Sequence, residues 1–130
     1  MPNWQPNWSD VIWNWGAASA ASHELRRMAD RLDESAQERR QLASAAQAEW
    51  RGRFRDEFDG DLAHMVGEAQ NIAAELRAAA GQIDNASDRA RAEQQHRERE
   101  RERWRREKRE EERREREARE RRERERRKNS

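Results

Sequence analysis

Two stretches of helical apolar spacing dominate the hydrophobic pattern of this chain. In residues 17–48, apolar side chains recur at three- and four-residue steps or their multiples, which places them on one stripe of a helix. The second stretch begins at residue 54 and alternates threes and fours to about residue 90, the spacing of a left-handed coiled-coil seam. The pattern therefore predicts an all-α fold with two amphipathic helices.

The larger apolar residues of the two stripes form the predicted packing surface. Alanine fills many of the other steps in the first stripe, and Arg39 interrupts it. An alanine-rich stripe lets another helix approach closely but buries little area per contact. The predicted seam residues are Leu25, Met28, Leu32 and Leu42 in the first helix and Phe54, Phe58, Leu62, Met65, Ile72, Leu76 and Ile83 in the second.

Trp50 and Gly52 lie between the two stretches, within residues 49–53. Glycine ends a helix and permits a turn, and an indole can fill the seam beside that turn. These residues predict a corner, so that the two helices form an antiparallel hairpin over residues 17–90.

Four small residues lie seven positions apart on the opposite face of the second helix: Gly60, Gly67, Ala74 and Gly81. Glycine costs about 1 kcal/mol in a helix interior, so a stripe of it calls for an explanation. A close contact with another helix is one interpretation, and an exposed face that tolerates glycine is the other.

Composition divides the chain further. Charged residues make up 44% and hydrophobic residues 32% of the 130 positions, which excludes a large globular core and fits one domain. Residues 91–128 contain 19 basic and 13 acidic residues, a net charge of +6, whereas residues 1–90 contain 10 and 15, a net charge of −5. We therefore expect an N-terminal head at residues 1–16, the hairpin, and a charged tail at residues 91–130.

Tryptophan is concentrated in the head, where the tripeptide Pro-Asn-Trp occurs twice and two prolines disfavour a helix. The head either folds back on its own hairpin and caps the open end, or contacts a partner or a membrane interface. Its lack of basic residues disfavours the membrane. The candidate contact residues are Trp4, Trp8, Trp13, Trp15 and, in the tail, Trp104.

The tail is either a solvated single helix or disordered. Glutamate and arginine are good helix formers, and pairs such as Glu93 with Arg97 and Glu110 with Arg114 stand four residues apart. Each such pair stabilises a helix by about 0.2–0.5 kcal/mol. We favour the helical alternative, in which the second helix continues to about residue 126.

Catalysis finds no support in the sequence. The chain has no cysteine, no tyrosine and no glycine-rich phosphate loop, and its three histidines are dispersed. Asp61, His64 and Glu68 share a helical face, but metal binding would require further ligands or an enclosing pocket. We expect a protein that is not an enzyme and has no metal or cofactor.

Nucleic acid is an alternative partner, because arginine-rich runs contact phosphate backbones. Acidic residues interleave with the arginines of the tail and screen its field, which disfavours this interpretation. A third interpretation is a structural spacer, in which the charged helix only sets a distance.

No apolar run approaches the ~20 residues of a membrane-spanning helix. The first residues also lack the basic and apolar regions of a cleaved signal peptide. We expect a cytoplasmic protein, or one that is exported without a signal peptide.

Trp50, Gly52, Phe54 and Phe58 between two long helices resemble the WXG family of small helical hairpins. Members of this family are substrates and partners of bacterial type VII secretion, and the resemblance covers residues 17–90. It implies that the tryptophan and glycine form the bend and that hairpins pair into four-helix bundles, as a homodimer or as a heterodimer with another hairpin protein. The arginine- and alanine-rich composition also resembles that of a high-GC actinobacterium.

Two features depart from the family. Many exported members carry a Tyr-x-x-x-Asp/Glu signal after the second helix, whereas this chain has no tyrosine, and Lys108 stands four residues after Trp104. The head and the tail also have no counterpart in the two-helix pattern of the family. The resemblance thus implies an interaction protein that is a secretion substrate or an accessory docking partner.

Overall fold

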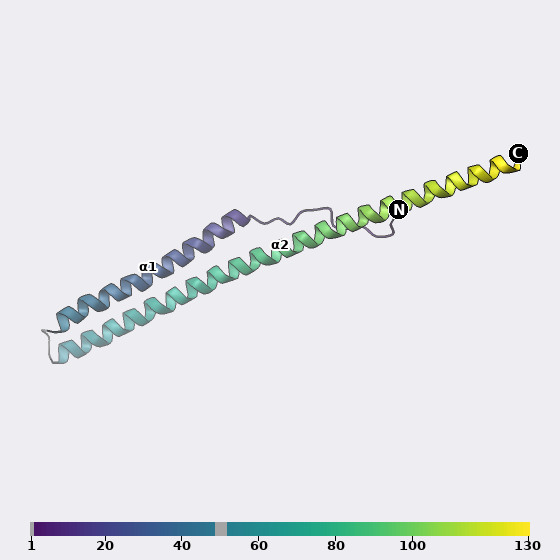
Figure 1. The fold of residues 1–130 in the computed structure, drawn as a ribbon. Helices are drawn as coiled ribbons and strands as arrows, with labels where there is room; N and C mark the ends of the chain where they lie inside the picture. Colours follow the sequence, from purple (N-terminus) through teal and green to yellow (C-terminus); the bar gives the residue numbers. More distant parts are fainter. Residues whose placement is uncertain (1, 49–51) are drawn as a thin grey trace. The chain divides into compact units, whose positions relative to one another are not determined.

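Two long helices make up most of the computed structural model, which describes residues 2–48 and 52–130. Helix α1 spans Trp15–Gln47 and helix α2 spans Arg53–Asn129, and the described residues contain no strand (Figure 1). The prediction of an all-α fold with two packed helices is confirmed. Trp50 of the predicted corner lies outside the described residues.

Helix α1 begins at Trp15 because Asn14 caps it. Asn14 has an extended backbone, and its Oδ1 accepts a hydrogen bond from the Ala17 amide at 2.9 Å. Two prolines precede this cap, at positions 2 and 6, and residues 2–13 are not helical. The helix therefore starts two residues before the predicted boundary at residue 17.

Gly52 leads directly into α2. Its φ of +99° lies in the left-handed region, which glycine adopts without steric strain. Its carbonyl oxygen accepts hydrogen bonds from the amides of Arg55 at 3.2 Å and Asp56 at 3.3 Å. Asp56 in the first turn also suits the positive end of the helix dipole.

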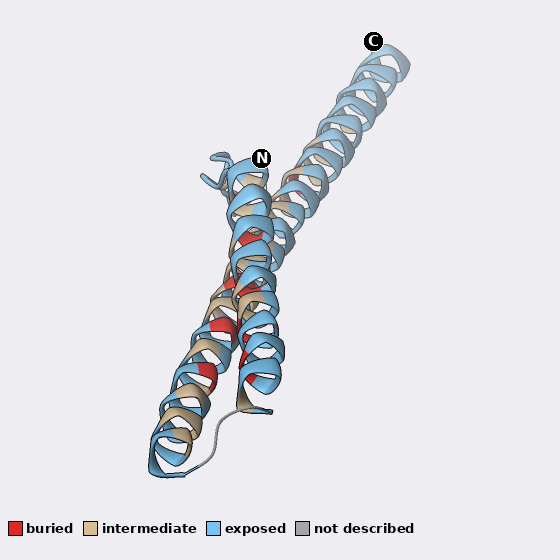
Figure 2. Ribbon diagram, turned by 90° about the vertical axis from the view of Figure 1, so that its left-hand side faces the viewer, coloured by how far each residue is buried: buried red, intermediate tan, exposed pale blue. Residues whose placement is uncertain are grey.

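The chain forms two compact units, which are Asn14–Asp88 and the combination of Met1–Trp13 with Arg89–Ser130. In the first unit, the hairpin, α1 and α2 run side by side and both carry buried positions (Figure 2), which small residues occupy. Both buried stripes repeat every seven residues, as expected for helices that pack side by side. The buried residues are Ser22, Ala29, Ala36 and Ala43 of α1 and Val66, Ala73 and Ala80 of α2.

Ion pairs along one margin of the hairpin match its antiparallel arrangement. Arg26 lies 2.6 Å from Asp84, and Arg77 lies 2.9 Å from Asp30 and 2.6 Å from Asp33. Exposed pairs of this kind each contribute about 0–1 kcal/mol. They nevertheless join early residues of α1 to late residues of the hairpin part of α2, as an antiparallel arrangement requires.

The large apolar residues of the predicted seam flank this intrachain seam. None of the predicted seam residues is buried in the described hairpin, and the prediction did not include Val66, Ala73 or Ala80. Close helix packing has room for a methyl group but not for a long side chain, so the larger residues are displaced sideways. Leu25, Leu32, Phe58, Leu62, Leu76 and Ile83 are half-buried, whereas Met28, Leu42, Phe54, Met65 and Ile72 are exposed.

A larger side chain in the alanine seam should destabilise the hairpin. We expect Ala73→Leu to lower the free energy of unfolding by about 1–3 kcal/mol, because overpacking forces the helices apart. Ala74→Leu is the matched control, since Ala74 is exposed while Ala73 is fully buried. Urea unfolding followed by circular dichroism measures both, and equal stabilities of the two variants would contradict the seam.

Candidate interaction surfaces

One long side of the hairpin carries large apolar side chains from both helices. Leu42 is 73% exposed, and Met65 and Ile72 are 45% and 47% exposed. Seven-residue steps link Met65 to Ile72 and to Phe58, so they share one face of α2. We call this surface the apolar edge; its residues are Met28, Leu32, Leu42, Phe58, Leu62, Met65 and Ile72.

A groove of about 330 Å³ opens between α1 and α2 on the apolar edge. Leu42, Phe58, Leu62 and Met65 line it together with two alanines, and charged Arg39 and Asp61 complete the lining. An adjacent hollow extends the surface from Leu32 to Met65. An apolar centre with charges beside it is typical of a protein-binding surface.

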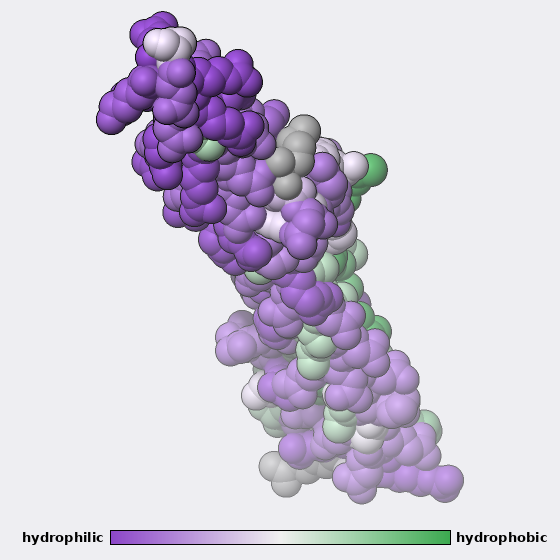
Figure 3. Space-filling view, turned by 90° about the vertical axis from the view of Figure 1, so that its right-hand side faces the viewer, coloured by the Kyte–Doolittle hydropathy of each residue, from purple (hydrophilic) through white to green (hydrophobic). Residues whose placement is uncertain are grey.

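Hydrophobic surface gathers along one margin of the space-filling view, whereas most of the remaining visible surface is hydrophilic (Figure 3). Single apolar residues on a surface are common and need no explanation. A contiguous row of apolar residues marks an interaction site more often than single residues do, because its exposure to water is unfavourable.

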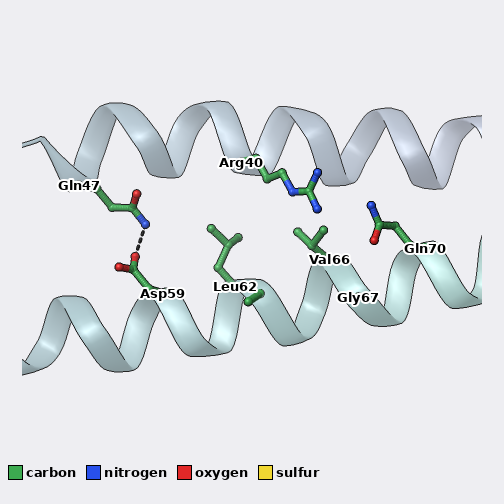
Figure 4. A pocket seen from close by; sticks show the side chains of 8 residues that line it. Arg40, Gln47, Asp59, Leu62, Val66, Gly67 and Gln70 are labelled. Atoms are coloured by element: carbon green, nitrogen blue, oxygen red, sulfur yellow. Dashed lines mark hydrogen bonds between the residues drawn. The ribbon is translucent and has the colours of Figure 1, made fainter.

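The opposite side of the hairpin is polar. There the amide of Gln47 donates a hydrogen bond to Asp59, and Arg40 and Gln70 extend across a shallow pocket between the helices (Figure 4). Val66 and Leu62 form the floor of this pocket, and Gly67 lies at its side. We call this side the polar edge.

The glycines of α2 do not serve the packing of α1 against α2. A Cβ atom placed on Gly60, Gly67 or Gly81 would meet no atom within 4 Å. A close contact of these glycines within the described part of the chain is therefore excluded. An exposed tolerant face and a contact with a second molecule are both compatible with this open space.

A second surface belongs to the other unit, where the head residues 2–13 lie along the tail part of α2. The Val11 amide donates to Gln94 Oε1 at 2.8 Å, and the Trp4 indole donates to Glu107 Oε2 at 2.6 Å. The head therefore lies antiparallel to the tail: its later residue Val11 contacts Gln94, and its earlier residue Trp4 contacts Glu107. The head does fold back on its own chain, but these contacts join it to the charged tail.

Aromatic rings and cations alternate where the head meets the tail. Trp8 packs edge-on against Trp104 with ring centroids 5.3 Å apart, and the guanidinium of Arg105 lies 5.6 Å from the Trp8 centroid. Arg103 covers the Trp4 ring at 4.5 Å. Such pairs each contribute about 0.5–1.5 kcal/mol, so together they hold the head in place.

The candidate tryptophans thus fall into two groups. Trp4, Trp8 and Trp104 come together between head and tail, where Trp104 is only 9% exposed. Trp15 belongs to the hairpin, where its indole donates to the Ser87 carbonyl at 3.0 Å. Trp13 remains partly exposed in the head.

Arg101 is the main polar anchor of the head. Its guanidinium donates to the carbonyls of Asn7 at 2.9 Å and Ser9 at 2.6 Å and to the Asp10 carboxylate at 2.8 Å. Hydrogen bonds from Gln94 and Arg101 lower the pKa of Asp10 below its ordinary value. The sequence analysis did not single out Arg101, which stands in seven-residue register with Ala80.

No arrangement for catalysis or metal binding stands out among these residues. His64 and Glu68 form an exposed pair at 3.0 Å. Within residues 2–48 and 52–130, no group of three or more histidine, cysteine or acidic side chains could hold a metal ion. None of the described helices has a stretch apolar and long enough to cross a membrane.

No family model, curated protein or solved structure matches this chain. The fold is thus a helical hairpin and a head–tail unit, and each of them carries one candidate interaction surface.

Acid should loosen the head from the tail. The hydrogen bond from Trp4 lowers the pKa of Glu107 below its ordinary value of 4.5. A carboxyl whose pKa is lower in the folded state contributes stability above its ordinary pKa and loses it as the pH falls through the lowered value. We expect the Trp4 indole N–H resonance in ¹H–¹⁵N NMR to shift mainly below pH 4.5.

Glu107→Gln is the control for this titration, because it leaves an amide that can accept the indole hydrogen bond but cannot ionise. The Trp4 resonance of this variant should lose the part of the shift that Glu107 causes. A native Trp4 resonance that stays unchanged throughout the acidic range would contradict the contact.

Proposed function

We propose that this protein is a non-enzymatic helical-hairpin interaction protein, which acts by pairing its apolar edge with a second hairpin. The observation that carries the proposal is the groove lined by Leu42, Phe58, Leu62 and Met65 beside an alanine seam. Within one hairpin, Leu42 and Met65 of this groove remain exposed to solvent. A second hairpin, either another copy or a related protein, would bury them in a four-helix bundle.

The energetics of the hairpin support pairing. Burial of a CH2 group contributes about 0.8 kcal/mol. Of the seven buried residues in the described hairpin, five are alanine and one is serine, so each adds little. Small domains with so little buried area are marginal by themselves. Covering the apolar edge would add larger side chains to the core and stabilise both partners.

Type VII secretion is the setting we propose for this pairing. The support is the resemblance of residues 17–90 to WXG hairpins, together with the left-handed backbone of Gly52 directly before α2. The missing Tyr-x-x-x-Asp/Glu signal favours an accessory or targeting partner over a conventional secreted substrate.

The tail suits a spacer role beside this function. Helix α2 continues to Asn129, and ion pairs four residues apart accompany it, such as Arg103 with Glu107 at 3.3 Å and Arg114 with Glu110 at 3.9 Å. Nucleic-acid binding is the weaker alternative, because Arg101, Arg103 and Arg105 already contact the head.

Loss of the apolar edge should abolish pairing. We expect the native chain to have twice the mass of the 15.6 kDa protomer in light scattering on a sizing column. The double variant Met65→Ser/Ile72→Ser should be a monomer, because it places hydroxyl groups in the surface that pairing would bury.

Gly67→Ala is the matched control on the polar edge, where an added Cβ meets open space. It should keep the dimer mass and stabilise the helix by up to about 1 kcal/mol. A native chain that is a monomer would refute self-pairing and direct the test to co-purification with a heterologous hairpin. A double variant that stays dimeric would refute the apolar edge as the interface.

A further inference from the structure

The contact stripe of α2 changes its chemistry while it keeps its register. Val66, Ala73 and Ala80 are buried in the hairpin, and the same seven-residue steps lead to Ser87, Gln94 and Arg101. Ser87 accepts from Trp15, while Gln94 and Arg101 bind the head. Small apolar positions thus give way to long polar ones along a single helix face.

The conformation of the partner segment explains this change. A helix such as α1 satisfies its own backbone hydrogen bonds, so it needs only small apolar neighbours. The head is not helical, and its backbone groups require partners from elsewhere. Gln94, Arg97 and Arg101 provide these partners through side chains long enough to reach an extended chain.

Polar contacts of the stripe recognise backbone and side chain together. Gln94 accepts from the Val11 amide at 2.8 Å and donates to Asp10 at 3.0 Å. Arg97 donates to the Ser9 carbonyl at 3.1 Å, which also accepts from Arg101. Along the head, acceptors at Asn7, Ser9 and Asp10 are therefore followed by a donor, the Val11 amide, and this unsymmetrical order favours one peptide direction.

Aromatic contacts add sequence selectivity. Trp8 packs edge-on against Trp104. Trp4, which ends the earlier Pro-Asn-Trp repeat, contacts Arg103 and Glu107. A ligand of this stripe is therefore an extended segment with tryptophans four residues apart and a carboxylate two residues after the second one. Side-chain recognition combined with backbone hydrogen bonds is a recurring mode of peptide binding.

We propose that Gln94, Arg97, Arg101 and Trp104, the tail stripe, form a peptide-binding site that accepts the head of a second copy of this chain. Recognition draws on head and tail residues, which form a unit apart from hairpin residues 14–88. The tether to the same chain therefore raises the local concentration of the head but adds nothing to its recognition. The exchange goes beyond hairpin pairing, because it needs no residue of the apolar edge.

A labelled peptide of residues 1–14 tests the exchange in the full chain by fluorescence anisotropy. The chain's own head competes with the peptide, so we use Trp8→Ala to weaken that head while the tail stripe stays intact. The peptide should bind the Trp8→Ala chain about tenfold more tightly than the native chain, because the lost aromatic contact is of the order of 1 kcal/mol. A Trp8→Ala peptide should bind both chains more weakly than the native peptide.

Arg101→Ala in the Trp8→Ala chain should weaken peptide binding at least about tenfold, because it removes three charge-assisted hydrogen bonds. Arg99→Ala is the matched control: it removes the same charge from an exposed position two residues away and should leave binding unchanged. Circular dichroism checks that α2 remains helical in all variants.

Absence of binding to the Trp8→Ala chain at millimolar concentration would overturn the proposal, and so would equal losses in the Arg99 and Arg101 variants. The Met65→Ser/Ile72→Ser chain separates this site from the proposed pairing. It should bind the peptide when it also carries Trp8→Ala, whatever its mass in light scattering.

Discussion

Close packing of alanine against alanine is the constraint on which the hairpin depends. Ala29, Ala73 and Ala80 are fully buried, so the two helices approach as closely as methyl groups allow. No leucine, methionine or phenylalanine is among the buried residues of the described hairpin. The large apolar residues consequently flank the seam, and the groove of the apolar edge follows from the same close approach.

The same helix face solves a different problem in the head–tail unit. An extended segment offers unsatisfied carbonyl and amide groups, which an alanine stripe would bury without partners at about 1–3 kcal/mol each. At the corresponding positions α2 carries Gln94 and Arg101, which bond to those groups. The sequence of α2 thus follows the conformation of what packs against it, first a helix and then an extended chain.

Much of the fold could be predicted from the sequence because its signals are local. Apolar spacing predicted both helices, and the density of Glu and Arg pairs predicted the helical tail, which ends at Asn129. Which alanines are buried could not be predicted, because alanine is common on every face of these helices. Spacing of the larger residues therefore drew the prediction to Met65 and Ile72, whereas Val66 and Ala73 fill the seam.

The candidate site was harder to predict because it depends on contacts between distant residues. Arg101 stands in a run of alternating charges, where nothing in the local sequence distinguishes it from Arg99. Its register with Ala80 becomes informative only with the knowledge that the head returns to the tail.

Charge alone gives a poor account of the tail. Its arginines differ in what they contact: Arg101 holds backbone carbonyls, Arg103 covers an indole, and Arg114 pairs with a glutamate one turn away. A scrambled tail would keep its helicity and its net charge. It would lose the contacts of arginine with the backbone carbonyls and with the indole. A pure spacer needs none of them, so the placement of Arg101 and Trp104 argues that this part of the tail serves recognition as well as distance.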